Sequence, residues 1–211
     1  MTQIPLILRL KKKQHRDIAR AQDLVVSSLY EIFNKAVIHG GTALWRCYSG
    51  NRFSEDVDVY IEKDLRKVSN LFTEFEKRGF KVERKKISDN SIYSSLNLSG
   101  TIVRFEAIFK KIGGILKDYE TIEGNTVIVY TLSAEELIKE KSRTYIKRRK
   151  IRDLYDVFFL IKFADKNKVK EAIEYLIKNY QKPIDESDLG AIILQGLIPD
   201  SVSMLNYLKS I

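Results

Sequence analysis

Residues 36–61, AVIHGGTALWRCYSGNRFSEDVDVYI, contain the pattern that decides the fold. A short apolar run leads into Gly40–Gly41, and a second run, residues 56–61, alternates polar and apolar residues as a β-strand does. Asp56 and Asp58 therefore share one face of that strand. Two carboxylates this close repel each other unless a cation lies between them. The stretch thus predicts two core strands, with a cation site on the second.

Gly40–Gly41 and Thr42 suit the binding of phosphate. Glycine lets the backbone approach a phosphate closely, and a helix beginning at Thr42 would direct its first amides at the same anion. Magnesium prefers one or two carboxylates, with water and phosphate oxygens completing its ligands. A phosphate site next to a metal site indicates an enzyme that acts on nucleotides.

The same residues resemble a known signature. Gly40–Thr42, a spacer and Asp56-x-Asp58 are similar to the pattern of nucleotidyltransferases, a group within the DNA polymerase β-like superfamily. Gly-Gly-Thr-Ala-Leu (40–44) followed by Arg-x-Ser-x-Asp-x-Asp (52–58) is most similar to the AbiEii/AbiGii toxins of toxin–antitoxin and phage-defence systems. This resemblance implies a nucleotidyltransferase-type mixed sheet flanked by helices.

Hydrophobic periodicity predicts an α+β fold followed by a helical C-terminal module. Helical patterns cover residues 14–34 and 64–78, and strand-like alternation covers 80–87, 92–98, 101–109 and 126–130. A capping box begins at Ser133, and Pro183 and Pro199 divide the remaining chain into about four helices. We therefore expect a nucleotidyltransferase domain over residues 1–130 and a helical domain over residues 131–211.

The composition is globular with a basic surplus. The 211 residues include 37 Lys and Arg and 28 Asp and Glu, which gives a net charge of +9. This surplus favours a polyanionic partner such as nucleic acid, although a solvated lysine-rich surface has the same charge. Cys47 is the only cysteine and has apolar neighbours, so we expect a buried thiol and no disulfide. No signal-peptide pattern or membrane-length apolar run occurs, which predicts a soluble cytoplasmic protein without membrane contact.

Glu106 is a candidate for a third carboxylate. The alternation in residues 101–109 puts Arg104 and Glu106 on one face, so Glu106 joins Asp56 and Asp58 if the two strands are neighbours. The resemblance implies a third carboxylate here, acting as a metal ligand or as a base towards the incoming hydroxyl. The alternative is an exposed Glu106 paired with Arg104.

Lys141 lies inside the apolar stripe of the first C-terminal helix, four residues from both Leu137 and Tyr145. A lysine in such a row either extends to solvent or meets an anion. The resembled family has a lysine in the segment that matches Glu140–Lys141. The resemblance therefore implies that Lys141 contacts the triphosphate and serves catalysis.

Asp153 and Asp156 allow two interpretations. From the residues alone, Asp153 suits the N-cap and Asp156 the N3 position of a helix, where carboxylates satisfy free amides. Arg-Asp-x-x-Asp (152–156) is also a recurring element of the resembled toxins. The resemblance instead implies that Asp156, with Asp153 beside it, belongs to the active site.

Other polar residues are candidates for binding nucleotide or RNA. Arg52 lies near the glycine turn and suits a phosphate, while Ser54 either contacts the nucleotide or caps the turn. A basic run suits a nucleic-acid backbone, although it equally suits a solvated helix end. Its members are Arg143, Lys147, Arg148, Arg149, Lys150 and Arg152.

The resemblance implies a nucleotidyltransferase that transfers NMP from an NTP to an acceptor hydroxyl with the help of Mg²⁺ or Mn²⁺. It further implies the toxin of an AbiE-like system, with RNA as acceptor, specifically the tRNA 3′ end, and with a cognate antitoxin protein. Two alternatives remain. One is transfer to a protein hydroxyl, as AMPylating antitoxins perform it, and the other is RNA binding without catalysis.

Overall fold

The computed structural model describes residues 4–211, which divide into two compact units. Unit 1 consists of residues 4–49 and Phe53–Thr131. Unit 2 consists of Gly50–Arg52 and Leu132–Ile211. The chain therefore passes between the units at three points in the sequence, because a three-residue segment of the first half belongs to unit 2.

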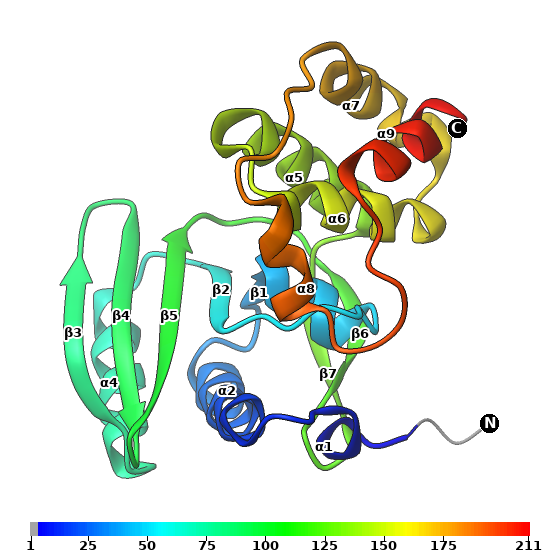
Figure 1. Cartoon of the computed structure of the whole chain (residues 1–211). Helices are drawn as coiled ribbons and strands as arrows, with labels where there is room; N and C mark the ends of the chain where they lie inside the picture. Colours follow the sequence, from blue (N-terminus) through cyan, green and yellow to red (C-terminus); the bar gives the residue numbers. More distant parts are fainter. Residues whose placement is uncertain (1–3) are drawn as a thin grey trace. The chain divides into compact units, whose positions relative to one another are not determined.

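Unit 1 is built on a sheet that has seven strands in the described residues (Figure 1). The strands are β1 Val37–His39, β2 Asp56–Ile61, β3 Lys81–Ile87, β4 Ser91–Leu98, β5 Thr101–Phe109, β6 Ile115–Glu120 and β7 Thr126–Thr131. Their order is β3-β4-β5-β2-β1-β7-β6, with β1–β7 and β2–β5 parallel and the other neighbours antiparallel. This mixed sheet confirms the predicted α+β fold class.

Two long helices pack on one face of the unit 1 sheet. They are α2 Lys13–Ile32 and α4 Leu65–Lys77, which contact β2, β3 and β5. Alternate residues of β5, such as Phe105, are fully buried beneath them, and Phe75 of α4 meets Phe105 edge to face at 5.5 Å. Burying large aromatic side chains in this layer is a main source of stability. The opposite face of β2 and β5 keeps their polar residues accessible.

The short elements of unit 1 include one difference from expectation. They are α1 Leu6–Arg9, α3 Gly40–Thr42 and the π-helical turn Ala43–Cys47. The helix expected to begin at Thr42 instead begins at Gly40, because the positive φ of +68° at Gly40 turns the chain directly out of β1. Cys47 is buried as expected, and burial raises the pKa of its thiol to about 12.

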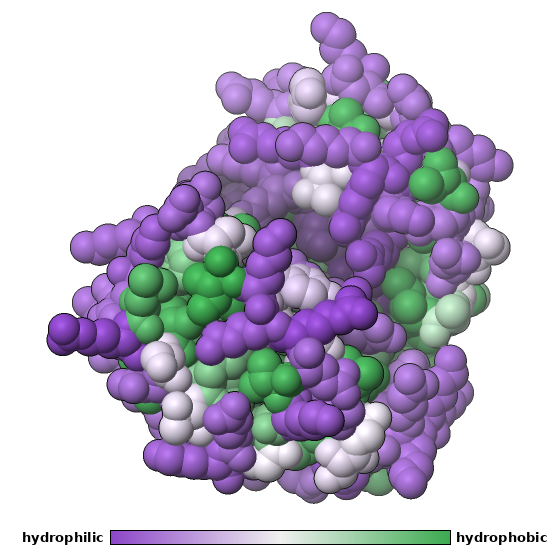
Figure 2. Space-filling view, turned by 90° about the vertical axis from the view of Figure 1, so that its left-hand side faces the viewer, coloured by the Kyte–Doolittle hydropathy of each residue, from purple (hydrophilic) through white to green (hydrophobic). Residues whose placement is uncertain are grey.

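The two edges of the unit 1 sheet differ in how they avoid further pairing. Strand β3 has exposed lysine and arginine side chains along almost its whole length, and the face that carries it is mostly hydrophilic (Figure 2). Such charges discourage another strand from pairing with an edge. The other edge is β6, which the sequence does not predict because Lys117 and Asp118 interrupt its alternation.

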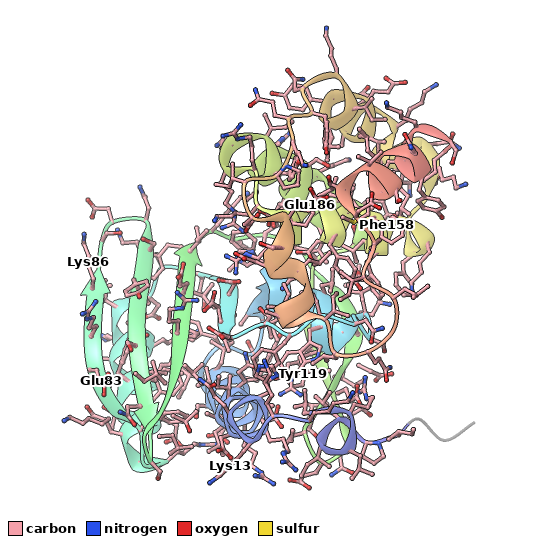
Figure 3. The ribbon with its side chains drawn as sticks, viewed as in Figure 1. Lys13, Glu83, Lys86, Tyr119, Phe158 and Glu186 are labelled. Carbon is pink, nitrogen blue, oxygen red and sulfur yellow. The ribbon has the colours of Figure 1, made fainter. Side chains whose placement is uncertain are left out.

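Unit 2 is helical. Its elements are α5 Ala134–Arg148, α6 Ile151–Leu160, η2 Ile161–Phe163, α7 Lys166–Lys178, η3 Glu186–Asp188, α8 Leu189–Ile192 and α9 Ser201–Lys209. The capping box at the start of α5 is confirmed, with Ser133 and Glu136 bonding each other's amides. Phe158 of α6 meets Tyr207 of α9 edge to face at 5.2 Å, and Glu186 Oε1 accepts from the Ser201 amide at 2.7 Å (Figure 3). These contacts join η3 and α6 to the last helix.

The segment Gly50–Arg52 is tied to unit 2 by backbone pairing. The Leu194 amide donates to the Asn51 carbonyl at 2.8 Å, and Arg52 forms a β-bridge with Ile193. The Asn51 amide group donates to the Gln195 carbonyl, also at 2.8 Å. These bonds fix the backbone from which the Arg52 side chain extends. Within residues 4–211, no helix combines the length and apolar character needed to cross a bilayer.

Candidate active site

Strand pairing brings the three predicted carboxylates together in unit 1. Asp58 of β2 lies directly opposite Glu106 of β5, and Asp56 lies opposite Arg104, in a parallel register. Successive side chains of a strand alternate between faces, so these four residues share one face. That face is the partly accessible one, since the residues between them are fully buried. The neighbouring strand β1 adds His39, which is in register with Asp58 and stacks on Tyr60 at 4.0 Å.

The electrostatics of this group show an excess of negative charge. The pKa of Glu106 is raised by its partial burial and then by the charges of Asp58 and Asp56. Arg104 and His39 act in the opposite direction but do not cancel the rise. A carboxylate whose pKa is raised by like charges gains from any added cation. The group is therefore chemically suited to bind one.

Arg104 is the residue of this site that the sequence did not assign. The alternation of β5 suggests Glu106 as its partner, but the Nε of Arg104 donates to Asp56 Oδ1 at 2.5 Å. The register between β2 and β5 decides this, and the sequence carries no signal for that register. Arg104 thus acts as the counter-ion of Asp56, one of the predicted metal ligands.

The carboxylates fit a divalent ion as a partial ligand set. Among residues 4–211, no three His, Cys, Asp or Glu side chains already stand at the spacing of a complete metal site. Asp58 and Glu106 lie side by side on neighbouring strands, and Asp56, whose Oδ1 accepts from Arg104, lies on the same face. Magnesium usually takes only one or two carboxylates and completes its shell with water and phosphate. The donor chemistry therefore fits, with part of the shell left to other ligands.

Gly40 lies against the carboxylate of Asp58. Its φ is +68°, and a Cβ at this position would overlap Asp58 Oδ2. Only glycine meets both conditions without strain. The close approach brings the backbone of the glycine turn next to the predicted metal ligand, as a phosphate-binding turn requires.

Thr42 and Ser54 support the site through the backbone. The Thr42 side chain is fully buried, and its hydroxyl donates to the carbonyl of Asp56. The side-chain amide of Gln22 donates to the carbonyl of Ser54 at 2.9 Å and to that of Asp56 at 3.3 Å. These bonds hold the start of β2 in place. Thr42 therefore positions the carboxylates, and Gln22 is a positioning residue that the sequence did not reveal.

Unit 2 contains a second charged cluster, which is buried. Both carboxylate oxygens of Asp156 accept from Arg52, Oδ1 from Nε at 2.5 Å and Oδ2 from Nη2 at 2.7 Å. Lys141 Nζ lies 2.8 Å from Asp156 Oδ2 and 3.4 Å from Asp153 Oδ1. Arg148 binds Asp153 through two nitrogens, at 2.6 and 2.9 Å. We name these five residues, Arg52, Lys141, Arg148, Asp153 and Asp156, the buried charge cluster.

The buried charge cluster keeps the carboxylate of Asp156 ionised. Burial alone would raise the pKa of Asp156, but the charges of Arg52 and Lys141 outweigh burial and lower it. Asp156 and Asp153 are both fully buried, and Arg52 is 2% exposed. Lys141 is 8% exposed, so it does not extend to solvent. It meets an anion, as one of the two sequence interpretations proposed, and in this structure the anions are the two aspartates.

The interpretation of Asp153 and Asp156 as helix caps is wrong. Helix α6 begins at Ile151, with Lys150 as the N-cap and no side-chain cap. The Ile151 amide donates instead to Asp185 Oδ1 at 2.8 Å. Asp153 lies in the first turn of the helix and Asp156 in the second. Asp153 pairs mainly with Arg148, which precedes α6, whereas Asp156 pairs with Lys141 of α5 and with Arg52, which is distant in sequence.

The basic run does not form one uniform surface. Three of its members have local partners: Arg148 binds Asp153, Arg149 donates to Gln181 Oε1 at 3.0 Å, and Lys150 lies 3.5 Å from Asp185. These residues help to hold the turn between α5 and α6. Arg143 and Lys147 are exposed on α5, and Arg152 is half-buried.

Comparison with protein families identifies the chain. The family described as "Nucleotidyl transferase AbiEii toxin, Type IV TA system" matches residues 23–200. Comparison with curated proteins gives no match.

Solved structures with a similar fold agree with this result. A putative nucleotidyltransferase from H. pylori has a TM-score of 0.63 at 19% identity, over 94% of this chain and 95% of that chain. JHP933 from Helicobacter pylori has a TM-score of 0.62 at 18% identity, over 94% and 92%. ANT(2″)-Ia, in complex with adenylyl-2″-tobramycin, has a TM-score of 0.53 at 15% identity, over 77% of this chain and 98% of that chain. At these identities the likeness concerns the fold. The family match over most of the chain confirms the resemblance read from the sequence: the protein belongs to the AbiEii nucleotidyltransferase toxin family and is a nucleotidyltransferase.

Proposed function

We propose that this protein transfers NMP from an NTP to a hydroxyl of RNA, with the 3′ end of tRNA as acceptor, in a reaction that depends on Mg²⁺ or Mn²⁺. The observation that carries the proposal is the register of β2 and β5. It puts Asp58 opposite Glu106 and next to Asp56, with Gly40 packed against Asp58. A carboxylate group with excess negative charge beside a glycine turn is the chemistry that a metal-bound triphosphate needs.

Asp56, Asp58 and Glu106 would hold the metal, and a bound divalent ion would stabilise charge on the phosphates. The backbone amides of Gly40, Gly41 and Thr42 would bind phosphate oxygens at the start of the short helix. For Asp56 to serve as a ligand, Arg104 must release it, and Arg104 is then itself available to a phosphate. Placement and electrostatics supply most of the rate in such reactions.

The transfer step places two demands on the site. The acceptor hydroxyl oxygen forms a bond to the α-phosphorus, the bond from that phosphorus to the bridging oxygen breaks, and pyrophosphate leaves. The hydroxyl proton must go to a base. Glu106 is placed to accept it if Asp56 and Asp58 alone hold the metal, because it lies opposite Asp58 on the same face of the sheet.

Lys141 would bind a phosphate of the nucleotide, and Asp156 and Arg52 would hold it in position. The buried charge cluster has three cations and two carboxylates, so one positive charge is in excess. The side chain of Arg148 is 42% exposed, so this positive charge is accessible to an added anion. Ser54, the exposed part of the basic run and the net charge of +9 support contact with nucleotide and RNA.

Incubation with Mg²⁺, each α-labelled NTP in turn and total RNA tests the proposal. We expect label on RNA, concentrated in the tRNA band, from one or a few NTPs, and none with Asp58→Asn. Label on protein would favour transfer to a protein hydroxyl. Retained RNA binding with no label anywhere would contradict the proposal. As a readout independent of turnover, Mn²⁺ binding followed by electron paramagnetic resonance should weaken in Asp58→Asn.

Family membership supports a toxin role in an AbiE-like phage-defence system, with a cognate antitoxin protein. We expect expression of the chain to arrest growth and Asp58→Asn to abolish the arrest. Co-expression of a neighbouring reading frame should restore growth. Growth that continues under strong expression of active enzyme would contradict this part of the proposal while leaving the transfer reaction standing.

A further inference from the structure

A groove in unit 2 combines cations, an unpaired hydroxyl and an aromatic ring. It lies between α5 and α7 and has a cavity volume of about 500 Å³. Its lining includes, from α5, Lys139, Ser142 and Arg143 and, from α7, Lys168, Glu171 and Tyr175. We name it the α5–α7 groove. None of its residues belongs to the carboxylate site or to the buried charge cluster.

Helix geometry explains why these side chains meet. Positions 139, 142 and 143 are spaced i, i+3, i+4, and positions 168, 171 and 175 are spaced i, i+3, i+7. Each set therefore lies on one helix face. Helices α5 and α7 pack against each other, so the two faces border the same hollow.

The charge of the α5–α7 groove is positive, although Lys168 also acts on Glu135 of α5 and helps to lower the pKa of that carboxyl. Lys139, Arg143 and Lys168 face a single carboxylate, Glu171. In the part of the chain that the structure describes, none of the three cations lies within 4 Å of a carboxylate oxygen. Arg143 thus differs from Arg148, Arg149 and Lys150 of the basic run, which have local partners. Cations that form no close ion pair in a concave site favour the entry of an anion.

Ser142 gives the groove a polar floor. It is 1% exposed, and its Oγ has no hydrogen-bond partner within residues 4–211. A buried hydroxyl without a partner costs stability, and most native hydroxyls avoid this state. The Oγ is itself buried, so a ligand oxygen can accept from this hydroxyl only after neighbouring side chains at the floor of the groove move aside. An oxygen-rich anion bound in that way would remove the cost.

Tyr175 supplies a flat apolar surface at the groove. Its side chain is 51% exposed. An exposed tyrosine beside cations is the usual arrangement for a nucleic-acid strand, whose bases stack on the ring while the phosphates meet the cations. An acidic peptide would bind the cations through its carboxylates, but it has no base to stack on the aromatic ring. The ring therefore favours a nucleic acid over an acidic protein segment.

We propose that the α5–α7 groove binds single-stranded nucleic acid, with successive backbone phosphates on Lys139, Arg143 and Lys168, one of them reaching the Ser142 hydroxyl, and a base on Tyr175. This inference deepens the proposed function, because it assigns a surface to the RNA acceptor and rests on RNA being that acceptor. It adds Lys139, Ser142, Lys168 and Tyr175 to the RNA-contacting residues, and it separates Arg143 from the rest of the basic run.

Binding of a fluorescent single-stranded oligouridine to the full-length chain tests the proposal, without nucleotide and with EDTA present. We compare Lys139→Ala/Arg143→Ala/Lys168→Ala with Lys166→Ala/Lys170→Ala/Lys209→Ala, which removes equal charge from exposed lysines of unit 2 outside the groove. The groove variant should lower the salt slope of log K by about 2, as expected for three lost phosphate contacts on a single strand. The control should keep almost the full slope.

Two single variants examine the floor and the ring. Tyr175→Ala should weaken binding by about fivefold or more, whereas Tyr175→Phe should keep most of the affinity because it keeps the ring. Ser142→Ala should weaken binding without lowering the midpoint of thermal unfolding, since the hydroxyl has no partner in the protein. A role confined to stability would move the midpoint and leave the affinity of the folded protein unchanged.

The outcomes separate this proposal from the reaction. Equal affinity and salt slope in the groove variant and its control would overturn the groove assignment, whatever the transfer assay gives. Displacement of the RNA by polyglutamate at equal affinity, with no effect of Tyr175→Ala or Ser142→Ala, would assign the groove to an acidic protein and would also overturn it. Suppose that the groove variant loses RNA binding and that the wild-type chain shows no transfer activity. This result would support the groove as the nucleic-acid site and would refute the proposed transfer reaction.

Discussion

The two charged clusters of the molecule are built on opposite principles. In unit 1, Asp56, Asp58 and Glu106 gather like charges on a partly open sheet face, with Arg104 as a counter-ion of Asp56. In unit 2, Asp153 and Asp156 are fully buried, and cations surround them. The pKa of Glu106 is accordingly raised, while the pKa of Asp156 is lowered.

This contrast distinguishes a group whose charges are unbalanced in the free protein from a group whose charges largely compensate each other. Like charges kept together without enough cations are unfavourable for the free protein and become favourable when a metal binds. Opposite charges buried together satisfy each other, and removing one partner leaves an uncompensated charge. We therefore expect substitutions in unit 1 to change activity most and substitutions in unit 2 to change stability most.

The largest expected effect is that of Asp58→Asn on the transfer reaction. Loss of one ligand charge should reduce the rate of label transfer by about 10³-fold, the equivalent of about 4 kcal/mol. Asparagine keeps the shape of the side chain, so the far-ultraviolet circular dichroism spectrum should not change. Full activity in this variant would show that the Asp58 carboxylate takes no part in the reaction.

Asp156→Ala should cost about 3 kcal/mol of unfolding free energy or more, because it leaves Arg52 buried without its main partner. Urea denaturation measures the loss. The matched control is Arg52→Met/Asp156→Leu, which removes both charges and should recover much of the stability. If the double variant were as unstable as the single one, charge compensation would not be the reason for the loss.

Gly40→Ala should cost more than Gly100→Ala, although both glycines have a positive φ. At Gly100 an added Cβ meets nothing within 4 Å, so this substitution measures the backbone cost alone, about 1 kcal/mol. At Gly40 the Cβ would overlap the Asp58 carboxylate, which adds steric cost and should displace a catalytic group. Urea denaturation and the transfer assay should both separate the two variants, and equal behaviour would contradict the close packing.

The stability that Asp156 contributes should depend on pH with a defined sign. Its folded-state pKa is lowered, so the contribution is present above the unfolded pKa, near 4, and disappears as the pH falls through the lower folded value. The difference in melting temperature between wild type and Asp156→Asn should therefore shrink on acidification below about pH 4. A difference that stays constant over this range would show that the charge of Asp156 is not the stabilising factor.

The smallest expected effect concerns Arg104. Its side chain is 42% exposed, so its ion pair with Asp56 is worth at most about 1 kcal/mol. Arg104→Gln should therefore tighten Mn²⁺ binding in the absence of nucleotide by up to about fivefold, because it frees Asp56. Titration followed by electron paramagnetic resonance measures this affinity. Unchanged affinity would indicate that Arg104 does not compete with the metal.

The sequence predicts those parts of the carboxylate site that depend on local periodicity. Alternation in β2 and β5 puts Asp56, Asp58 and Glu106 on polar faces, and the family signature indicates their chemistry. The partner of Arg104 could not be predicted, since it depends on the register between two strands separated by more than forty residues. Periodicity carries no information about such a register.

The buried charge cluster also shows that local sequence patterns do not predict contacts between residues far apart in the chain. The helical stripe leaves solvent and an anion as alternatives for Lys141, and in the structure Lys141 meets the carboxylates of Asp153 and Asp156, whereas its predicted contact with the triphosphate stays a prediction. Local reasoning also makes Asp153 and Asp156 helix caps, which is wrong, because Arg52 lies 104 residues away from Asp156 and outweighs the capping preference. Strand β6 was missed for a related reason: pairing with β7, rather than its own alternation, makes it a strand.

Because Gly50–Arg52 belongs to unit 2, the N-terminal and C-terminal parts of the chain cannot evolve independently of each other. A recombination event that joined a foreign C-terminal module at residue 132 would keep Arg52, which is encoded upstream within the family signature, and would leave it without its main partner unless the new module supplied an aspartate like Asp156. The tripeptide and the C-terminal module must therefore change in concert. Expressed alone, residues 132–211 should fail to form a stable fold unless a synthetic peptide spanning 50–52 is supplied.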